Sequence, residues 1–271
     1  MIFSPYAATP EDAPEHPVTE IPGDPSTGII VLCDHASNEI PPEYRSLGLP
    51  ESQLHRHIAY DIGAAGMTHA LAEAFGAPAL LTNFSRLIID PNRGEDDPTL
   101  VMRLSDGAVV PGNARVDDAE IGRRIKRFYR PYDRAITNAI AATLAKGIRP
   151  IIVSVHSFTP VWRGSPRPWH AGILWAKDPR LSRSLIEALE ADEALVVGDN
   201  EPYDGGLKGD VIDRHALDHG FSNTLIEIRQ DLIADPGDAK AWGWRLAEAL
   251  KPILEHPLHR EDFRSSTGSK A

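Results

Sequence analysis

The chain has 271 residues, of which 42% are hydrophobic and 25% are charged, and such values are typical of folded globular proteins. Acidic residues outnumber basic ones by 39 to 28, so the formal net charge is −11, which disfavours binding to nucleic acid or to anionic membranes. The single cysteine, Cys33, excludes an intrachain disulfide framework and a cysteine-rich metal site. We therefore expect a cytoplasmic globular protein, whose charge still allows a small anionic partner where arginines gather locally.

The two ends of the chain differ in composition from its middle. Residues 1–26 are rich in proline, alanine and acidic residues, and residues 260–271 are polar, so we expect a loosely ordered N-terminal arm and a polar C-terminal tail. Residues 27–259 are expected to form a single α/β domain. No window approaches the roughly 18 apolar residues that span a bilayer, and no basic stretch precedes an apolar run near the N-terminus. We expect neither a membrane segment nor a signal peptide.

Between these ends, short β-branched runs alternate with amphipathic helical stretches. In chain order, we expect a strand at 28–33, a helix at 61–75, a strand at 79–82, an apolar run at 87–90, a helix at 117–146, strands at 151–155 and 171–176, a helix at 180–191, strands at 195–198 and 223–228, and a helix at 238–254. This alternation predicts an α/β fold of three layers, αβα, around a mostly parallel central sheet.

Local signals mark the ends of two of these helices. Gly76 follows the apolar face of the first helix and is a natural C-terminal cap. Asp117 and Glu120 have the spacing of a capping box at the start of the second helix. Pro131 is expected to kink or divide that helix, because proline removes a backbone donor from a helix interior.

Histidines follow two of the predicted strands. His35 comes after the strand at 28–33, and His156 comes after the strand at 151–155. Ligand sites of open parallel sheets lie at the carboxyl ends of the strands, so the two imidazoles are candidates to bind a zinc ion. Hydrogen-bonded structural histidines are the plainer alternative.

A catalytic zinc ion needs a third protein ligand and keeps one position open for water. Asp61 lies at a plausible helix N-terminus and is our candidate for this third ligand. His57 and Asp34 compete with it for the same role.

Glu227 lies within the last predicted strand, between Ile226 and Ile228. A carboxylate buried among such neighbours costs several kcal/mol or becomes protonated unless it has a partner. We therefore expect a metal ion, its water or Arg229 beside Glu227. An ion pair with an arginine would make the role of Glu227 structural, whereas a metal or water partner would make it catalytic.

Arg86, Asn92 and Arg93 flank the apolar run at 87–90. Arginine and asparagine together bind carboxylates through charge-assisted hydrogen bonds. The alternative is an ordinary turn in which the arginines pair with the acidic residues at 95–97.

Other familiar catalytic signatures are absent from the sequence. It contains no G-x-S-x-G elbow, no Walker A loop, no H-E-x-x-H motif and no C-x-x-C motif. Because Ser37 and Ser157 each lie near a histidine, a serine hydrolase remains an alternative.

Four segments together resemble one known family. They are VLCDHASN at 31–38, SRLIIDPNR at 85–93, SVHSFTP at 154–160 and NTLIEIRQDL at 223–232. In this order they resemble the N-formylglutamate amidohydrolase family. The resemblance implies a phosphorylase/hydrolase-like αβα fold, similar to that of zinc carboxypeptidases, in which zinc activates water against an amide.

The resemblance also implies a role for each matched residue. His35, Asp61 and His156 would bind one zinc ion, and Glu227 would act as the general base. The anionic substrate would be held by the residues that match the family's Arg and Asn-Arg motif, with a further arginine from the last strand: Arg86, Asn92, Arg93 and Arg229.

The implied reaction converts N-formyl-L-glutamate to glutamate and formate. An amidase or carboxypeptidase acting on another acyl amino acid or short peptide is the second possibility, since folds and sites are reused for different substrates. A non-catalytic protein that binds a small ligand is the third. The sequence does not predict the oligomeric state.

Overall fold

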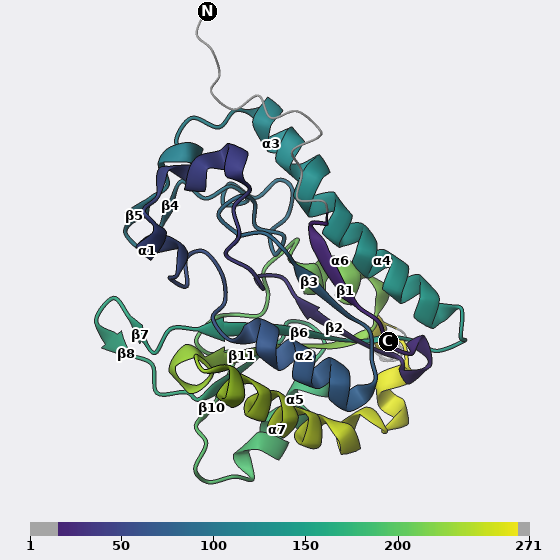
Figure 1. The fold of residues 1–271 in the computed structure, drawn as a ribbon. Coiled ribbons are helices and arrows are strands. Elements are labelled where there is room, and N and C mark those ends of the chain that lie inside the picture. Colours follow the sequence, from purple (N-terminus) through teal and green to yellow (C-terminus); the bar gives the residue numbers. More distant parts are fainter. Residues whose placement is uncertain (1–15, 265–271) are drawn as a thin grey trace, which may run out of the picture.

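The computed structural model describes residues 16–264, and Figure 1 shows their arrangement. The predicted three-layer αβα fold is confirmed, because a seven-stranded sheet lies between helices that pack on both of its faces. The sheet strands are β1 (Val18–Ile21), β2 (Ile29–Cys33), β3 (Ala79–Thr82), β6 (Ile151–Phe158), β9 (Ala171–Leu174), β10 (Val197–Asp199) and β11 (Ser222–Arg229). Two hairpins lie outside the sheet: β4 (Leu104–Ser105) with β5 (Ala108–Val109), and β7 (Val161–Trp162) with β8 (Ser165–Pro166).

The strand order in the sheet is β1-β3-β2-β6-β11-β9-β10. The four strands β3, β2, β6 and β11 run parallel to one another. By contrast, β1 is antiparallel to β3, and β9 is antiparallel to β11 and parallel to β10. Because the four central strands share one direction, their carboxyl ends meet at one edge of the sheet, where ligand sites of such folds lie.

Helices cover both faces of the sheet. They are α1 (Glu51–Leu54), α2 (Ala64–Phe75), α3 (Asp118–Arg124), α4 (Arg130–Leu144), α5 (Arg180–Glu190), α6 (Val211–His215) and α7 (Pro236–Leu254). One face is covered by α2, α5 and α7, which pack against one another, and the other face is covered by α4 and α6 (Figure 1). Within residues 16–264, no helix is both long enough and apolar enough to cross a lipid bilayer.

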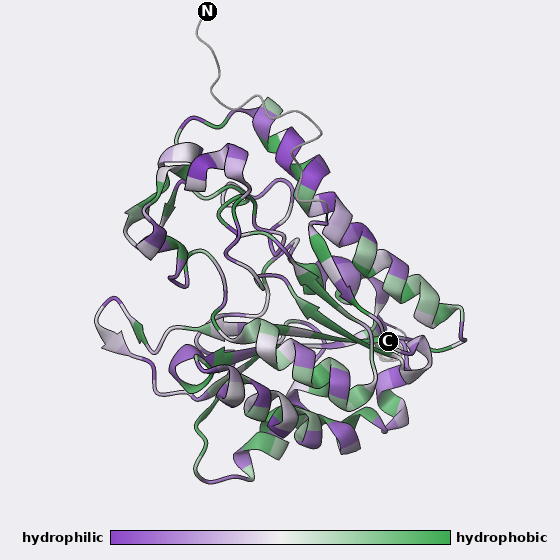
Figure 2. Cartoon of the chain, in the orientation of Figure 1, coloured by the Kyte–Doolittle hydropathy of each residue, from purple (hydrophilic) through white to green (hydrophobic). Residues whose placement is uncertain are grey.

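The side chains of β2 show how the strands fill both layers. Ile29, Val31 and Cys33 face the core beneath α2 and α7, whereas Ile30 and Leu32 face the core beneath α4. Successive side chains of a strand point to opposite faces, so a strand covered on both sides is apolar throughout. Figure 2 shows this as nearly continuous hydrophobic colour along the central strands, in contrast to the two-coloured helices.

A separate apolar core is formed by segments that follow β2 and β3, and it includes the apolar run at 87–90. Leu87, Ile88 and Ile89 are fully buried, but the run forms turns instead of a strand. Its buried carbonyls are satisfied by side chains: Asn113 donates to the carbonyl of Leu87, and Arg124 donates to that of Ile88, both at 2.8 Å. The run therefore needs no strand partner. It ends at Asp90, whose carboxylate lies beside His35.

The predicted helix at 117–146 consists of three pieces. Asp117 caps α3 by accepting a hydrogen bond from the backbone N–H of Glu120, as the capping-box spacing predicts. A π-helical turn at Ile125–Tyr129 separates α3 from α4, and Pro131 lies in the first turn of α4. Proline has no N–H to donate to the preceding turn, and the regular α-helical hydrogen bonding is interrupted by the π-helical turn just before it, in which Arg130 donates to Ile125.

The chain ends are more structured than expected where they are described. Residues 18–21, inside the predicted arm, form β1 and pair along β3, so this part of the expectation was wrong. The β-branched residues in β1 cover the edge of β3, and the proline-rich surroundings masked that signal. At the other end, the Arg260 guanidinium donates to the carbonyls of Thr27 and Gly28. Residues 1–15 and 265–271, the rest of the predicted arm and tail, lie outside the described residues.

Candidate metal and active site

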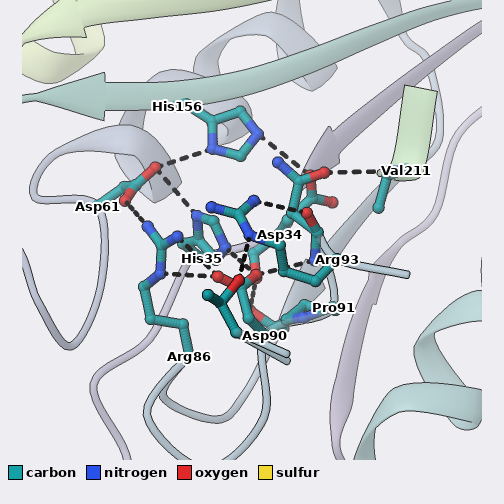
Figure 3. A network of polar contacts seen from close by, with 12 residues as sticks. Asp34, His35, Asp61, Arg86, Asp90, Pro91, Arg93, His156 and Val211 are labelled. Carbon is teal, nitrogen blue, oxygen red and sulfur yellow. Dashed lines mark hydrogen bonds and ion pairs between the residues drawn. The ribbon is translucent and has the colours of Figure 1, made fainter. Parts of the chain in front are cut away.

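Three buried side chains meet at the carboxyl edge of the central strands (Figure 3). His35 follows β2, Asp61 precedes α2, and His156 lies near the end of β6. The Oδ2 atom of Asp61 is 3.3 Å from Nδ1 of His35 and 2.9 Å from Nδ1 of His156. One ligand atom from each residue lies within 4.8 Å of the other two. The structure thus brings together the three residues that the sequence analysis named as metal ligands.

Backbone hydrogen bonds fix Asp61 beside the end of β2. Its N–H donates to the carbonyl of His35 at 2.9 Å, and its own carbonyl accepts from Ala64, the first residue of α2. Between them, Gly63 has a φ of 82°, a left-handed conformation that favours glycine. The turn into α2 therefore sets the direction in which the Asp61 carboxylate points.

Each histidine of the cluster is held at its other ring nitrogen by a second buried carboxylate. Nε2 of His35 lies 2.7 Å from Oδ1 of Asp90, and Nε2 of His156 lies 3.1 Å from Oδ2 of Asp34. Tyr132 in turn donates to Asp34 at 2.7 Å. A carboxylate at one imidazole nitrogen keeps the proton there and turns the opposite nitrogen toward a metal, an arrangement common around metal-bound histidines.

The charges in this network stabilise one another. Burial opposes ionisation of Asp61, but the charge of His35 and the hydrogen bond with His156 hold its pKa well below the ordinary value. Burial likewise disfavours the charged form of His156, yet Asp34 and Asp61 raise its pKa well above the ordinary range. Asp90, paired with Arg86, also has a strongly lowered pKa despite its burial. The carboxylates of the network are therefore ionised at neutral pH.

Glu227 lies beside this cluster, and one of its carboxylate oxygens has no hydrogen-bond partner among the described residues. On the parallel strands β11 and β6, Glu227 stands directly opposite His156. The side chain is 7% exposed, and its Oε2 atom has no hydrogen-bond partner among the described residues. Burial raises the pKa of Glu227 to about 7, although the nearby charge of His156 opposes part of the rise. A carboxylate with a pKa near neutrality can both accept and donate a proton under ordinary conditions.

The donor set fits a divalent metal ion. Two imidazole nitrogens and one carboxylate oxygen converge on one space, and the far nitrogen of each histidine is engaged by Asp90 or Asp34. Three protein ligands of this kind leave a coordination position for water or substrate. The unpartnered Oε2 of Glu227 supplies the acceptor that such a water requires. The cluster thus has the composition of a site for a divalent metal ion.

A cavity of about 330 Å³ opens beside the cluster. Its walls come from the loops after the central strands, from the β4–β5 and β7–β8 hairpins and from the segment 203–210. The cavity is lined by polar groups of the cluster, including His35, Asp61, His156 and Glu227, and by apolar groups including Ile58, Met102, Phe158, Trp162 and Leu207. The candidate metal position is therefore reachable by a small molecule.

Three of the four predicted substrate-binding residues line this cavity. They are Arg86, Asn92 and Arg93. Arg86 donates to Asp90 through Nε and Nη2, at 3.1 and 2.7 Å, and to Asp61 through Nη1 at 3.4 Å. The side-chain oxygen of Asn92 accepts from the N–H of Val211 at 3.0 Å, which ties the turn at Asn92 to the start of α6.

The structure does not bring Arg229 to the cavity. Its guanidinium donates to Asp231 at 2.7 Å and to the backbone carbonyls of residues 167–169. Arg229 is the last residue of β11, and alternation along a strand places its side chain on the same face as Glu227 only if the strand stays regular. At the end of the strand, the Arg229 side chain turns instead toward the neighbouring loop at 167–169. Arg229 therefore forms no ion pair with Glu227.

A comparison with known families finds a match over residues 27–234, and the matching profile is that of N-formylglutamate amidohydrolase. The chain belongs to the N-formylglutamate amidohydrolase family. The profile spans the four motifs and all the residues of the metal cluster. A comparison with the curated proteins finds no significant match.

Two solved structures resemble this member of the N-formylglutamate amidohydrolase family over most of its length. A gene product from Agrobacterium tumefaciens is 35% identical, with a TM-score of 0.83, and the match covers 88% of this chain and 95% of the other. An N-formylglutamate amidohydrolase from Ralstonia eutropha JMP134 is 22% identical, with a TM-score of 0.56, and the match covers 87% and 98% of the two chains. At that identity the second likeness shows a shared fold.

The residues that the sequence analysis considered as alternatives make other contacts in this family member. Asp34, considered as a metal ligand, holds His156 from outside the cluster, and His57 lines the cavity at some distance, beside Trp162. The Ser157 hydroxyl donates to a backbone carbonyl at 2.8 Å and accepts from Gln230. No histidine is hydrogen-bonded to Ser157 within the described chain, so the arrangement is not that of a serine nucleophile.

Two residues of the network were missed by the sequence analysis. Asp90 lies in the motif at 85–93, directly before Pro91. The signal that could have identified it is an acidic residue at the end of an apolar run. Tyr132 lies on α4, on the far side of the sheet from α2, and reaches Asp34 through the interior. Nothing in the local sequence of α4 distinguishes this tyrosine from an ordinary core residue.

Proposed function

We propose that this chain is a metal-dependent hydrolase that cleaves the amide bond of an N-acyl amino acid. N-formyl-L-glutamate, the substrate in the name of the family, is the first compound to test. The observation that carries the proposal is the position of Glu227, whose unpartnered Oε2 lies beside a cluster of two histidines and one aspartate. A buried carboxylate without a partner is costly in a purely structural role, but it is what a hydrolytic site requires.

His35, Asp61 and His156 would hold the ion, with zinc as the expected metal and one ion per chain. When bound, zinc acts as a Lewis acid that polarises a carbonyl oxygen and lowers the pKa of water to about 7. The residues behind the ligands keep them in place: Asp90 fixes the ring of His35, and Asp34 fixes the ring of His156.

Glu227 moves the proton in this proposal. Its carboxylate takes a proton from the attacking water and passes it to the nitrogen of the leaving amine, so that the C–N bond breaks as the amine becomes neutral. A pKa of about 7 allows the same group to accept and then to donate the proton near neutral pH. Arg93 would bind the substrate carboxylate, because its guanidinium faces the cavity and forms no ion pair within the described chain.

A substitution of Glu227 tests this proposal. We expect Glu227→Gln to retain the metal but to lower the rate of amide hydrolysis by about 10² to 10⁴, as for the loss of a general base. The control is Glu248→Gln, which changes an exposed carboxylate on α7 and is expected to keep full activity. Metal content and amine release would be measured for both variants. Full activity of Glu227→Gln would contradict the role of Glu227, and an inactive, metal-free wild-type protein would contradict the proposed function as a whole.

A further inference from the structure

The cavity needs a second free cation if its substrate carries two carboxylates, as N-formyl-L-glutamate does. Arg93 supplies the partner for one of them. Asp204 and Asp210 also line the cavity, so a second carboxylate would be repelled unless a positive charge lay beside it. A desolvated carboxylate needs a cationic or hydrogen-bonding partner in any case.

Arg86 lines the cavity but is occupied by the protein's own carboxylates. Three of its nitrogens donate to Asp90 and Asp61, and both of these aspartates are buried. A substrate carboxylate could bind Arg86 only by displacing a buried aspartate, which would leave that aspartate without its partner. The second cation must therefore come from another residue.

Arg167 is a nearly buried cation without a counterion. It follows β8 directly and is 8% exposed. Its Nη1 atom donates to the hydroxyl groups of Tyr203 at 3.0 Å and of Thr159 at 3.2 Å, and within residues 16–264 its guanidinium forms no ion pair. A buried charge is costly unless an opposite charge compensates for the lost water. Arg167 is therefore a site where an anion would bind favourably.

Aromatic rings hold the Arg167 guanidinium against the wall of the cavity. Its central carbon lies 5.7 Å from the ring centroid of Phe158, 5.2 Å from that of Trp162 and 4.9 Å from that of Tyr203. All three residues line the cavity, as does Thr159. A guanidinium is attracted to the face of an aromatic ring, but the ring leaves its positive charge in place. The rings thus orient the cation without replacing a carboxylate.

One edge of the Arg167 guanidinium is free. Its Nε and Nη2 atoms make no hydrogen bond within the described residues, and both keep accessible surface. These two N–H groups form a planar fork that matches the two oxygens of a carboxylate.

The Tyr203 hydroxyl adds a further donor beside this edge. Its oxygen accepts a hydrogen bond from Arg167, so its own O–H is available to another acceptor. Burial raises the pKa of Tyr203, and the phenol therefore keeps this proton at neutral pH.

The backbone that carries Arg167 is fixed on both sides. Its N–H donates to the carbonyl of Pro160 at 2.8 Å, and its carbonyl accepts from Arg229 at 3.3 Å. Arg229, which the sequence analysis expected to bind the substrate, thus supports the segment from which Arg167 extends. Arg93 and Arg167 come from loops that follow β3 and β6, two strands that β2 separates in the sheet. The two cations are therefore held by separate segments.

We propose that Arg167 binds the second carboxylate of the substrate through its Nε and Nη2 atoms, and that the Tyr203 hydroxyl donates to the same carboxylate. Arg93 holds the other carboxylate. This inference rests on the proposed function, and it makes Arg167 the residue by which the site prefers N-acyl derivatives of acidic amino acids to those of neutral ones.

Two formyl amino acids isolate the effect of this charge. N-formyl-L-glutamate and N-formyl-L-glutamine have nearly the same shape and differ by one charge. With the metal-loaded wild-type protein we expect kcat/KM to be about tenfold or more higher for the glutamate compound, the range of a charge-assisted hydrogen bond. Equal values for the two compounds, or a preference for the glutamine compound, would overturn the inference.

Arg167→Met removes the charge and keeps an unbranched side chain among the rings. We expect this variant to lower the ratio of kcat/KM between the glutamate and glutamine compounds about tenfold or more. A purely structural role of Arg167 would reduce the hydrolysis of both compounds equally. A ratio that stays as in the wild type would therefore overturn the inference.

Arg163→Met is the matched control for a loss of positive charge on the same hairpin. Arg163 is exposed, and its guanidinium lies over the ring of Trp162, at 5.6 Å from the centroid. Because an exposed charge is screened by solvent, the ratio should stay as in the wild type. A fall in Arg163→Met as large as in Arg167→Met would show a long-range effect of charge in place of contact, and would contradict the role of Arg167.

Arg167→Lys decides the matter if Arg167→Met does not fold. A lysine keeps the positive charge among the rings but lacks the planar fork of two N–H groups. We expect the ratio to fall about threefold in this variant, between the wild type and Arg167→Met. An unchanged ratio in Arg167→Lys would show that the fork does not bind the carboxylate.

Binding of the free amino acids separates this inference from the proposed function. Calorimetric titration of the metal-loaded protein with L-glutamate and L-glutamine reports the preference without any hydrolysis. If neither formyl compound is hydrolysed but L-glutamate binds more tightly than L-glutamine, and Arg167→Met abolishes the difference, the proposed reaction is wrong and the role of Arg167 stands. If the formyl compounds are hydrolysed and Arg167→Met leaves both ratios unchanged, the reaction stands and the role of Arg167 is wrong. If neither is hydrolysed and neither amino acid binds, both are wrong.

Discussion

Asp90 links the two halves of the candidate site. One of its oxygens lies 2.7 Å from Nε2 of His35 and also accepts from the backbone N–H of Asn92, while the other accepts two hydrogen bonds from Arg86. The same carboxylate thus orients a predicted metal ligand and begins the turn that carries Arg93. We expect Asp90 to act through these neighbours and not by touching the substrate.

Asp90→Asn should weaken metal binding about 10- to 100-fold, the usual cost of removing a carboxylate behind a histidine ligand. The neutral amide can still fill the space, so the folded protein should remain intact. Competition with a chelator of known affinity measures the change. Asp96→Asn is the control, because Asp96 is exposed in the next turn of the chain. Unchanged metal affinity in Asp90→Asn would show that Asp90 does not position His35.

Arg93→Ala should raise KM for N-acyl amino acids about 10- to 100-fold, the range expected for one charge-assisted hydrogen bond. Metal content should stay as in the wild type, because Arg93 contacts none of the three predicted ligands. Arg134→Ala on the exposed side of α4 is the control for a general loss of positive charge. Steady-state kinetics measure KM for both variants. An unchanged KM in Arg93→Ala would show that Arg93 does not bind the substrate carboxylate.

At the scale of elements, α2 depends on the glycines at its two ends. Gly63 and Gly76 both adopt positive φ angles, of 82° and 61°. A Cβ atom on Gly63 would lie 2.3 Å from the carbonyl oxygen of Ile233, whereas one on Gly76 would meet nothing within 4 Å. The first glycine is therefore needed for close packing as well as for its backbone conformation.

Gly63→Ala should lower the free energy of unfolding by about 2 kcal/mol more than Gly76→Ala does, because only the first substitution adds a clash to the conformational strain. Since Gly63 sets the turn after Asp61, metal affinity should fall as well. Urea unfolding of both variants with saturating metal gives the difference. Equal destabilisation at the two positions would contradict the packing argument.

His259 makes the contact between the C-terminal turn and β11 sensitive to pH. Its Nδ1 lies 3.0 Å from the hydroxyl of Ser222, and burial, together with the charge of Arg180, lowers its pKa to about 4. The folded state therefore favours the neutral ring, and the unfolded chain takes up a proton at a higher pH, near 6.5. The stability should thus be complete above pH 6.5 and decrease as the pH falls from there to about 4.

Unfolding free energies measured between pH 7 and pH 4 test this contribution. In the wild type, His259 should account for a loss of up to about 3 kcal/mol over that range, from the difference between the two pKa values. His259→Asn removes the titrating ring, so the curve of this variant should be flatter by that amount. Parallel curves for the two proteins would show that His259 does not contribute.

The sheet strands were predictable because they are buried on both faces and read as continuous apolar runs, such as 28–33 and 151–155. The helix ends at Gly76 and Asp117 followed from local capping chemistry. The turn at 87–90 was not predictable, because its carbonyls are satisfied by the distant Asn113 and Arg124. The antiparallel direction of β9 likewise depends on chain crossings that local sequence does not record.

The residues of the candidate metal site were predictable to a similar extent as the fold. Polar residues after predicted parallel strands identified His35 and His156, and a carboxylate among apolar strand neighbours identified Glu227. Asp61 was a candidate because it lies at a plausible helix N-terminus, and the resemblance gave it the same role. The structure brings all four together. The carboxylates behind the histidines, and the turn of Arg229 away from the cavity, depend on contacts across the fold, and sequence patterns of one element cannot show them.

At the scale of the whole molecule, the candidate metal site joins three segments that are far apart in the chain. His35 follows β2, Asp61 begins the turn into α2, and His156 lies on β6. The two histidines and the surrounding carboxylates are held together by hydrogen bonds and by the ion pairs of Arg86 with Asp61 and Asp90. A ligand that binds the folded state and not the unfolded chain stabilises the fold in proportion to its affinity.

Saturation with metal should therefore stabilise the protein. At a free metal concentration of about 100 times Kd, the gain is about 3 kcal/mol, or roughly 5 to 10 °C in Tm for a domain of this size. Differential scanning calorimetry with and without added zinc measures it. His35→Ala should remove the zinc-dependent shift, and a shift that persists in this variant would place the stabilising ion elsewhere.

The most direct test of the account combines metal analysis with an assay of formate release from N-formyl-L-glutamate, before chelation, after chelation and after zinc is restored. We predict about one zinc ion per chain and release of formate that stops on chelation and returns with zinc. Formate release that is unaffected by removal of the metal, or a protein that binds zinc yet hydrolyses neither this compound nor any other N-acyl amino acid, would contradict it.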